Sequence, residues 1–268
     1  MSNFLRDQLI ENLTIHVDSL RDISSVFLTR GATGKANINE QDKDGNYLAF
    51  LTYIIRFDSK GYRVFSLDEL LEYFNKAKNV ERILFTLEDT ESLRTNRVTG
   101  TFLELRLDAK DQNSCFLTST SDDKDWVDSS ISAVNESLLK YKNKNGWFRT
   151  NWTQFAVQIF GVLVGFILSI WGAINVSPKL SVENSFLIIF ILLFLIFSNI
   201  WTFVYQKILI YIGLVFPNIK FVREHKYALH WLQQVFIGSF LVTIMLYLLS
   251  RGFDFFTKIL ASFLNSNI

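Results

Sequence analysis

Cysteine and histidine are scarce in this sequence, and their scarcity limits the chemistry that the chain supports. The one cysteine, Cys115, excludes an internal disulfide, and its place on a predicted strand favours a buried structural role over a reactive thiol. The three histidines, His16, His225 and His230, form no helical i, i+4 pair and have no acidic or cysteine partner at ligand spacing. We therefore expect no metal site and no cofactor.

Motifs for nucleotide, calcium and nucleophile chemistry are also lacking. The segment RGATGK at 30–35 has two residues between its glycines where a Walker loop has four, which favours a helix C-cap followed by a turn. The segment EQDKDGN at 40–46 spaces its acidic residues like a calcium loop, but Leu51 stands where that loop needs a glutamate. No G-x-S-x-G motif is present. We expect no catalytic residues, and a protein that is not an enzyme.

Charge is divided unevenly along the chain, although the net charge of the whole is only +1. Residues 1–139 contain 16 basic and 23 acidic residues, a net charge of −7, whereas residues 140–268 contain 11 and 3, a net charge of +8. Basic and aromatic residues do not interleave in the acidic half, so we expect no nucleic-acid partner. From Trp152 onward, apolar runs recur that are long enough to cross roughly 30 Å of hydrocarbon. The sequence therefore predicts an integral membrane protein with a soluble N-terminal half.

The N-terminal half, residues 1–145, has the patterns of an α+β domain with a mixed or antiparallel sheet and flanking helices. A helix is predicted from Leu67, where Ser66 and Glu69 stand at capping-box spacing, and a second one at 127–141. Strands are predicted at 47–57, 62–66, 82–88, 101–108 and 114–120. The alternation in TFLELRLD places three leucines on one face of the sheet, and we expect the opposite, charged face to be in solvent.

The beginning of the chain admits two interpretations. LTIHV at 13–17 and DSLRDISSVFLTRG at 18–31 fit a strand and then a helix closed by Gly31, whereas the spacing of the leucines also fits one longer helix. No charged segment followed by an apolar core opens the sequence. We therefore expect no cleavable signal peptide, and a domain that stays in the cytoplasm.

The C-terminal half, residues 146–268, is predicted to be an all-α membrane domain with three transmembrane helices, at about 155–176, 185–205 and 231–249. Residues 208–216 are expected to lie at the interface, to re-enter the bilayer or to extend the second helix until Pro217. After the third span, apolar residues at helical spacing predict an interfacial amphipathic helix. No span has a charged residue near its middle, which argues against coupled transport and proton pumping.

Small and polar residues mark two features of the predicted spans. A row of small residues recurs every four positions in the first span and predicts a close helix-packing seam, either within the chain or between the copies of a homo-oligomer. The seam consists of Gly161, Gly165, Ser169 and Ala173. In the second span, Ser198 and Asn199 are expected to line a pore formed by several copies or to make an inter-helix hydrogen bond.

Basic residues in short loops predict the orientation in the membrane. They gather before the first span and between the second and third spans, so we expect both flanks to be cytoplasmic. These residues are Lys140, Lys142, Lys144, Arg149, Lys207, Lys220, Arg223 and Lys226. Tryptophans near the span ends are expected to anchor the protein at the interface with the lipid bilayer: Trp147, Trp152, Trp201 and Trp231.

A cytosolic domain joined to a small helical membrane module resembles the plan of many bacterial inner-membrane proteins and of some membrane-acting effectors of bacterial defence systems. The leading hypothesis is a multi-pass inner-membrane protein whose cytosolic domain binds a protein or small-molecule ligand and controls an oligomerising, pore-forming module. The alternative is a membrane-anchored scaffold whose spans only localise the domain. Asn145 and Gly146 form the predicted flexible linker, which is short enough to transmit a rotation of the domain to the first span.

Overall fold

The computed structural model describes residues 4–33 and 49–222, together with isolated helical positions between 235 and 251. The chain divides into two compact units. The first comprises Met1–Trp147 and Phe216–His225, and the second comprises Phe148–Val215 and Lys226–Ile268. The first unit is an α+β domain, and the described part of the second is a pair of long apolar helices.

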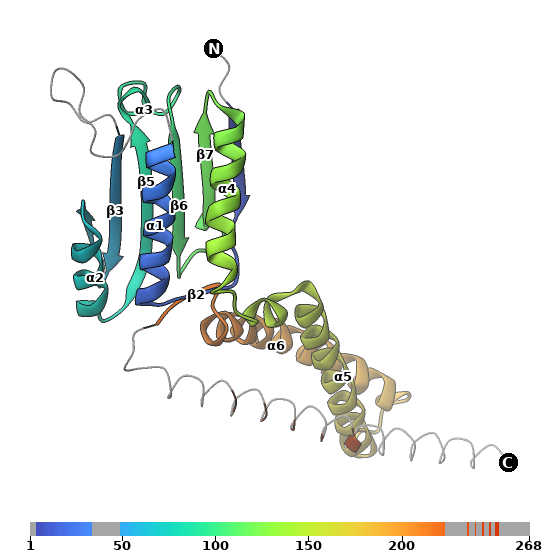
Figure 1. Ribbon diagram of the computed structural model, residues 1–268. Coiled ribbons are helices and arrows are strands. Elements are labelled where there is room, and N and C mark those ends of the chain that lie inside the picture. The colour runs from blue at the N-terminus through green and yellow to red at the C-terminus, as the bar shows by residue number, and fades with distance from the viewer. Residues whose placement is uncertain are drawn as a thin grey trace, which may run out of the picture. The chain divides into compact units, whose positions relative to one another are not determined.

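The α+β domain is built on a six-stranded sheet in the order β1-β7-β6-β5-β3-β4, in which every neighbouring pair is antiparallel (Figure 1). Its strands are β1 (Phe4–Leu9), β3 (Ala49–Phe57), β4 (Lys60–Val64), β5 (Val80–Asp89), β6 (Phe102–Asp108) and β7 (Phe116–Ser121). The prediction of an α+β domain is confirmed, and the antiparallel alternative is the one found. Strand β1 was not predicted from the sequence.

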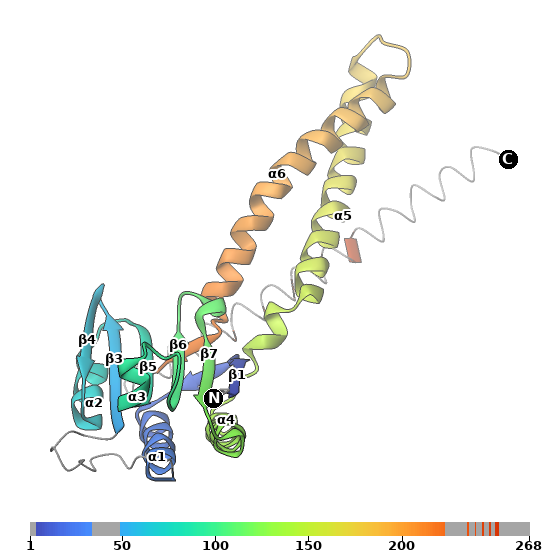
Figure 2. The same cartoon turned by 90° about the horizontal axis from the view of Figure 1, so that it is seen from above.

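Three helices cover one face of this sheet, as both views of the domain show (Figures 1 and 2). They are α1 (Val17–Thr33), α2 (Leu67–Lys76) and α4 (Lys124–Leu139). Helix α2 begins as its capping sequence predicts, because the backbone N–H of Glu69 donates to the Ser66 hydroxyl at 3.2 Å. The core between helices and sheet contains Phe27, Phe74, Phe85, Leu105 and Ile131, all fully buried.

The first residues of the chain follow the strand-then-helix interpretation. Strand β2 (Leu13–Ile15) is followed at once by α1, so the single longer helix is wrong. Gly31 does not close α1, which continues to Thr33. The remainder of RGATGK beyond Thr33, and the whole of EQDKDGN, lie outside the described residues.

The face of the sheet opposite the helices is not the freely solvated surface that the alternation in β6 predicted. Glu104 and Asp108 are 7% and 3% exposed. Arg97 follows the short helix α3 (Thr90–Arg94) and places its guanidinium 4.1 Å from the centre of the Phe102 ring, so it covers this part of the face. The prediction was wrong because ion pairs from neighbouring segments bury the acidic side chains.

The second unit contains α5 (Asn151–Val176) and α6 (Ser185–Val215), which pack together as a hairpin (Figure 2). The stretches Asn151–Lys179 and Ser185–Val215, 29 and 31 residues, are long and apolar enough to cross a membrane. Most of their residues are not buried by the protein. In the most apolar 18-residue stretch of each helix, 17% and 6% of the residues are buried. This pattern is typical of helices that face lipid rather than a protein core.

Helix α6 settles the alternatives for residues 208–216. These residues continue the helix to Val215, so it is about 46 Å long at 1.5 Å per residue rather than ending near 205. Two of the three predicted spans are therefore present as helices. The third, at 231–249, and the C-terminal amphipathic helix lie outside the described residues apart from isolated positions.

Candidate functional site

The chain leaves the α+β domain after Trp147 and returns to it at Phe216. The returning segment forms β8 (Ile219–Phe221), which pairs in parallel with β2 in a separate two-stranded sheet. Ile219 is fully buried, and the Phe221 ring packs edge-on against Phe74, with ring centres 6.3 Å apart. One strand of the domain therefore comes from sequence that lies beyond the apolar hairpin.

Asn218 holds the returning segment to the beginning of the chain. Its side-chain oxygen accepts from the backbone N–H of Asn12 at 2.9 Å, and its side-chain N–H donates to the Ile10 carbonyl at 3.2 Å. The backbone N–H of Leu13 donates to the Asn218 carbonyl at 3.0 Å. Because Asn218 is only 5% exposed, these bonds are shielded from water and are costly to break.

Two further asparagines connect the end of the first stretch of the domain to the same place. The backbone N–H of Asn143 donates to the Asn12 carbonyl at 2.7 Å, and its side chain donates to the Thr14 hydroxyl at 3.2 Å. The side chain of Asn145 donates to the Pro217 carbonyl at 3.0 Å. The segments that enter and leave the hairpin are thus bonded to each other. We call Asn12, Asn143, Asn145 and Asn218 the asparagine joint.

Asn12 is the centre of this joint. Its backbone φ of 61° lies in the left-handed region, which asparagine tolerates better than most residues. Its side chain lies against Gly146, where an added Cβ would be 2.5 Å from Asn12 Nδ2, so a side chain at residue 146 would displace that of Asn12. Its side-chain oxygen is buried and has no hydrogen-bond partner among the described residues.

The linker at Asn145 and Gly146 is not the flexible segment that was predicted. Both residues lie in a 3-10 helix, η2 (Asn145–Arg149). The Asn143 side chain accepts from the backbone N–H of Asn145 at 3.0 Å, which fixes the start of that helix. The prediction was wrong because these hydrogen bonds, which come partly from residues distant in the sequence, order a dipeptide that alone favours a turn.

The last turn of α4 is fixed to α1 beside the joint. The Tyr141 hydroxyl donates to Asp22 Oδ2 at 2.6 Å, and Lys140 Nζ lies 3.7 Å from the same carboxylate. Burial, together with the hydrogen bond and charge of Asp22, raises the pKa of Tyr141 to about 12. The backbone N–H of Thr14 donates to the Tyr141 carbonyl at 2.9 Å. These contacts connect β2 and α1 directly to the segment that leads into the hairpin.

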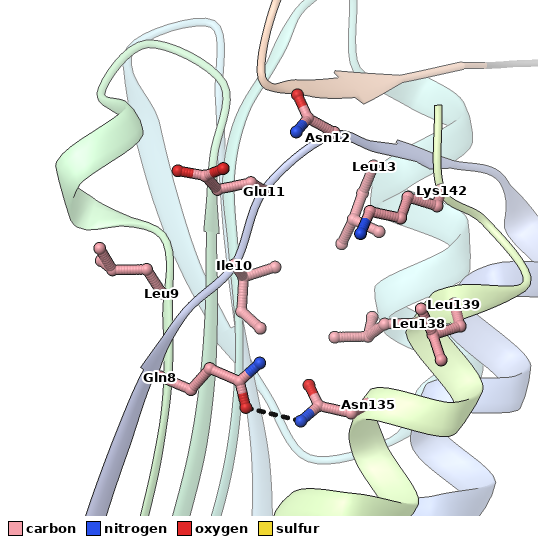
Figure 3. A pocket seen from close by; sticks show the side chains of 10 residues that line it. All are labelled: Gln8, Leu9, Ile10, Glu11, Asn12, Leu13, Asn135, Leu138, Leu139 and Lys142. Atoms are coloured by element: carbon pink, nitrogen blue, oxygen red, sulfur yellow. Dashed lines mark hydrogen bonds between the residues drawn. The ribbon is translucent and has the colours of Figure 1, made fainter. Parts of the chain in front are cut away.

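A cleft of about 400 Å³ adjoins the joint, between residues 8–13 and the last turns of α4 (Figure 3). Its aliphatic walls consist of Leu9, Ile10, Leu13, Leu138 and Leu139. Its polar groups are Gln8, Glu11, Asn12, Asn135 and Lys142. At one end, the Asn135 side chain donates to the Gln8 side-chain oxygen at 2.6 Å. Asn12 belongs both to the cleft lining and to the joint, and sequence reasoning did not identify this cleft.

The buried carboxylates of the sheet are all held in ion pairs. Glu81 pairs with Arg56 and Lys110 at 3.1 and 2.9 Å, and Asp108 pairs with Arg82 at 2.6 Å. Arg97 bridges two further acids, Glu88 at 3.3 Å and Glu104 at 3.2 Å. Burial raises the pKa of Glu104 even though Arg97 and Arg106 oppose the rise. This arrangement stabilises the sheet and leaves no open acid–base pair among these residues.

Metal chemistry has no evident site in the part of the chain that the structure describes. No group of three or more His, Cys, Asp or Glu side chains within 4–33 and 49–222 is placed to hold a metal ion. Cys115 is buried, and burial raises the pKa of its thiol, which makes it a poor nucleophile.

The predicted helix-packing seam lies inside the hairpin. Ser169 and Ala173 are fully buried, and a Cβ at Gly161 would overlap the indole of Trp201 on α6. Gly165 is less crowded, since its added Cβ would lie 3.6 Å from the Cβ of Phe197. Of the two interpretations of this row, packing within the chain is the one that the structure has. Trp201, which was predicted as an interfacial anchor, packs its indole on Gly161 within the hairpin.

The polar pair of the second span faces outward. Ser198 and Asn199 are both exposed on α6, and the Asn199 side chain donates to the Leu195 carbonyl at 3.0 Å within its own helix. The inter-helix hydrogen bond predicted for this pair is thus not made by Asn199 in the described hairpin. Trp147 and Trp152 are 80% and 78% exposed next to the start of α5. Trp231 lies outside the described residues.

The predicted basic flank residues occupy several elements. Lys140, Lys142 and Lys144 follow α4, Arg149 ends η2, and Lys207 lies on α6 with Nζ 5.4 Å from the centre of the Phe203 ring. Lys220 lies on β8, beside Thr14, and burial lowers its pKa. Arg223 and Lys226 lie outside the described residues.

Comparison of the chain with known protein families, with curated proteins and with solved structures found no match.

Proposed function

We propose that this protein is a non-enzymatic, multi-pass protein of the bacterial inner membrane, in which a cytoplasmic sensing domain controls a transmembrane module. The sensing domain is the α+β unit, and the transmembrane module contains α5 and α6. A ligand or partner bound by the domain changes the arrangement of the asparagine joint. The joint then alters the hairpin, and the hairpins of several copies together form a leak in the membrane.

One observation carries this proposal: both ends of the hairpin are built into the same domain. The first end follows Asn143 and Asn145, and the second precedes β8, a strand of the same unit. A scaffold that only localises a domain needs one attachment to its anchor. Here the two attachments are bonded to each other through Asn145 and Pro217. A change in the domain would therefore alter the spacing of the two helices.

The exposed surface of α6 supports assembly of several copies. Because the seam of α5 is filled by α6, copies would meet through other faces of the hairpin. Asn199 is exposed near the middle of the long apolar helix, where lipid offers a polar side chain no partner. One N–H of this amide donates to the Leu195 carbonyl, and contact with another hairpin would give its second N–H and its oxygen partners, which is a common basis of helix association in membranes.

The positions of the basic residues support the proposed orientation. Residues 140–147 belong to the basic flank before α5, and Lys220 belongs to the one after α6. Both lie in the same folded unit, so they lie on the same side of any membrane that the hairpin crosses. By the positive-inside rule that side is the cytoplasm.

The experiment is induced expression in bacteria with a membrane-potential dye. Wild type is compared with a variant carrying a six-residue Gly/Ser spacer after Gly146, with Asn145→Ala, and with Asn113→Ala as the matched control. Asn145 bonds to Pro217, whereas Asn113 is an exposed asparagine outside the joint. We expect wild type and Asn113→Ala to depolarise the cells, and the spacer and Asn145→Ala to reduce the effect at least fivefold at equal membrane content.

Two results would contradict the proposal. If wild type leaves the potential unchanged, the hairpin forms no leak under these conditions and the scaffold alternative gains support. If wild type depolarises the cells and the spacer variant does so equally, the membrane module works without a fixed connection to the domain.

A further inference from the structure

We propose that the cleft beside the asparagine joint binds a small aliphatic carboxylate that also carries an amide group, the chemistry of an N-acylated aliphatic amino acid or of a short peptide's C-terminus. This inference rests on the proposed function in taking the cleft as the place where the domain senses its ligand. The cleft has three regions, which differ in chemistry.

The middle of the cleft is aliphatic and accessible. Ile10, Leu13 and Leu138 direct their side chains into the space between β1 and α4 (Figure 3). Leu9 and Leu139, which are 64% and 63% exposed, also belong to the lining. Apolar side chains that line an open cleft are stabilised when an apolar group fills the space between them. A volume of about 400 Å³ lies in the range of small-ligand sites and holds a branched aliphatic side chain with its backbone groups.

One end of the cleft offers a single positive charge. Lys142 is held in place because its backbone bridges to Leu13, and Figure 3 shows its ammonium group directed into the cleft. It forms no ion pair with any residue of the described segments. Glu11, the acidic residue of the lining, directs its carboxylate away from the cleft (Figure 3). The Gln112 side chain donates to that carboxylate at 3.3 Å. The ammonium is therefore available to a ligand carboxylate.

The other end offers one donor and one acceptor. Gln8 and Asn135 share one hydrogen bond of 2.6 Å between their side chains. Each carboxamide has two N–H donors and one oxygen acceptor. The single bond between Gln8 and Asn135 uses one N–H and one oxygen. Whichever residue donates, the pair therefore keeps a free N–H on one residue and a free oxygen on the other. Figure 3 shows these remaining atoms directed into the cleft. A ligand amide, with its own C=O and N–H, is the complement of this pair.

The order of the three regions matches the order of groups in the ligand. A carboxylate at Lys142, a branched aliphatic side chain between the leucines and an acyl amide at Gln8 and Asn135 satisfy the cleft together. A free amino acid lacks the acyl amide, and a simple fatty acid of the same size has no N–H. Ligand bound in this way lies against Leu13 and Asn12, so its binding bears directly on β2 and the joint.

The test is isothermal titration calorimetry on the full chain in lipid nanodiscs, with N-acetyl-L-leucine as the probe. N-acetyl-L-leucine amide removes the carboxylate, and 4-methylpentanoate removes the amide. We expect saturable binding of N-acetyl-L-leucine and at least tenfold weaker binding of both analogues. N-acetyl-leucyl-leucine serves as a second probe: tighter binding of this peptide identifies a peptide C-terminus as the ligand, and weaker binding identifies a single acylated amino acid.

Variants assign the binding to the cleft. Lys142→Met is expected to weaken the binding of N-acetyl-L-leucine at least tenfold and to leave the binding of its amide analogue unchanged. Asn135→Leu is expected to weaken the binding of both compounds. Lys144→Met and Glu136→Gln alter exposed residues outside the lining and are expected to bind like wild type. Circular dichroism of each variant checks that the domain is folded.

The inference is overturned if none of the probes gives saturable binding, or if Lys142→Met binds N-acetyl-L-leucine as tightly as wild type does. Calorimetry does not depend on any effect on the membrane. Failure of binding together with loss of depolarisation in Asn145→Ala would reject this ligand class and keep the proposed function. Specific binding without any depolarisation would keep the ligand and reject the proposed leak.

Discussion

The backbone N–H of Asn12 donates to the side-chain oxygen of Asn218 at 2.9 Å, although the two residues are 206 positions apart in the chain. All of α5 and α6 lies between them. The bond joins the beginning of the domain to its last described strand, and it closes the domain around the two ends of an apolar hairpin. Several measurements follow from this relationship and from the contacts of the hairpin itself.

The first prediction concerns removal of the hairpin. Because Asn145 and Pro217 are hydrogen-bonded at 3.0 Å, a short Gly/Ser linker in place of residues 148–215 should join the two parts without strain. We expect residues 1–147 joined in this way to 216–222 to be more stable than residues 1–147 alone. Ile219 and Val222 are buried, and burial of two such side chains contributes roughly 3–6 kcal/mol. Urea unfolding followed by circular dichroism measures the difference.

A single substitution provides the control for that comparison. Ile219→Ala in the linked domain removes most of a fully buried side chain and should cost about 2–5 kcal/mol. Equal stability of the linked domain, its Ile219→Ala variant and the fragment 1–147 would show that β8 is not part of the folded domain.

The second prediction compares two glycines of α5. Gly161→Ala places a methyl group into the Trp201 indole, and overpacking of this kind costs about 1–3 kcal/mol or more. Gly165→Ala makes an ordinary contact with Phe197 and should be tolerated. The thermal unfolding midpoint in detergent should fall for the first variant alone. Trp201→Ala should restore part of the loss in the double variant, and additive effects of the two changes would mean that these side chains do not meet.

The third prediction concerns acid. Burial alone would raise the pKa of Asp108, but hydrogen bonds from the Asp111 and Lys110 backbone and from Arg82 outweigh it and hold the pKa below its ordinary value. The stability from the ionised group is therefore present above about pH 4 and is lost as the pH falls through the lower pKa of the folded state.

Asp108→Asn tests that sign. The variant should be less stable than wild type at pH 7 by about 1.5–3 kcal/mol, the usual contribution of hydrogen bonds to a charged group, and the gap should narrow below pH 4. Asp7→Asn, an exposed aspartate on the edge strand β1, is the control and should match wild type throughout. A gap that stays constant from pH 7 to pH 3 would assign the loss to packing instead of charge. Thermal unfolding at each pH provides the measurement.

The fourth prediction concerns orientation. In a Cys115→Ala background, Lys144→Cys marks the domain side and Ser181→Cys marks the connection between α5 and α6, and both positions are exposed. A membrane-impermeant maleimide should label residue 181 in intact spheroplasts and residue 144 only in inverted vesicles. Labelling of both positions from one side would show that the hairpin does not cross the bilayer.

Local patterns in the sequence were sufficient for much of the fold. The spacing of Ser66 and Glu69 identified the start of α2, and the leucines of β6 alternate as expected of a strand with one core face. Both depend on neighbours within a few residues. Strand β1 was missed because every residue in it is exposed, so it has neither an apolar face nor a turn signal.

The candidate site could not be predicted in the same way. The joint depends on hydrogen bonds between asparagines far apart in the chain, and asparagine alone indicates only a turn or loop. Strand β8 has three residues, too few for a periodic pattern. The row that begins at Gly161 showed that a helix would pack closely there, but spacing does not specify whether its partner belongs to the same chain.

The position of β8 in the sequence also sets the order in which the protein is made. Residues 1–147 leave the ribosome first, then both apolar helices, and only afterwards Ile219, whose side chain fills the domain core. At ribosomal speeds of about 5–20 residues per second, the strand that completes the domain follows Trp147 by roughly 4–14 s. In a newly made chain, β2 therefore has no β8 to pair with until the hairpin has been synthesised. Completion of the α+β domain thus follows synthesis of the hairpin.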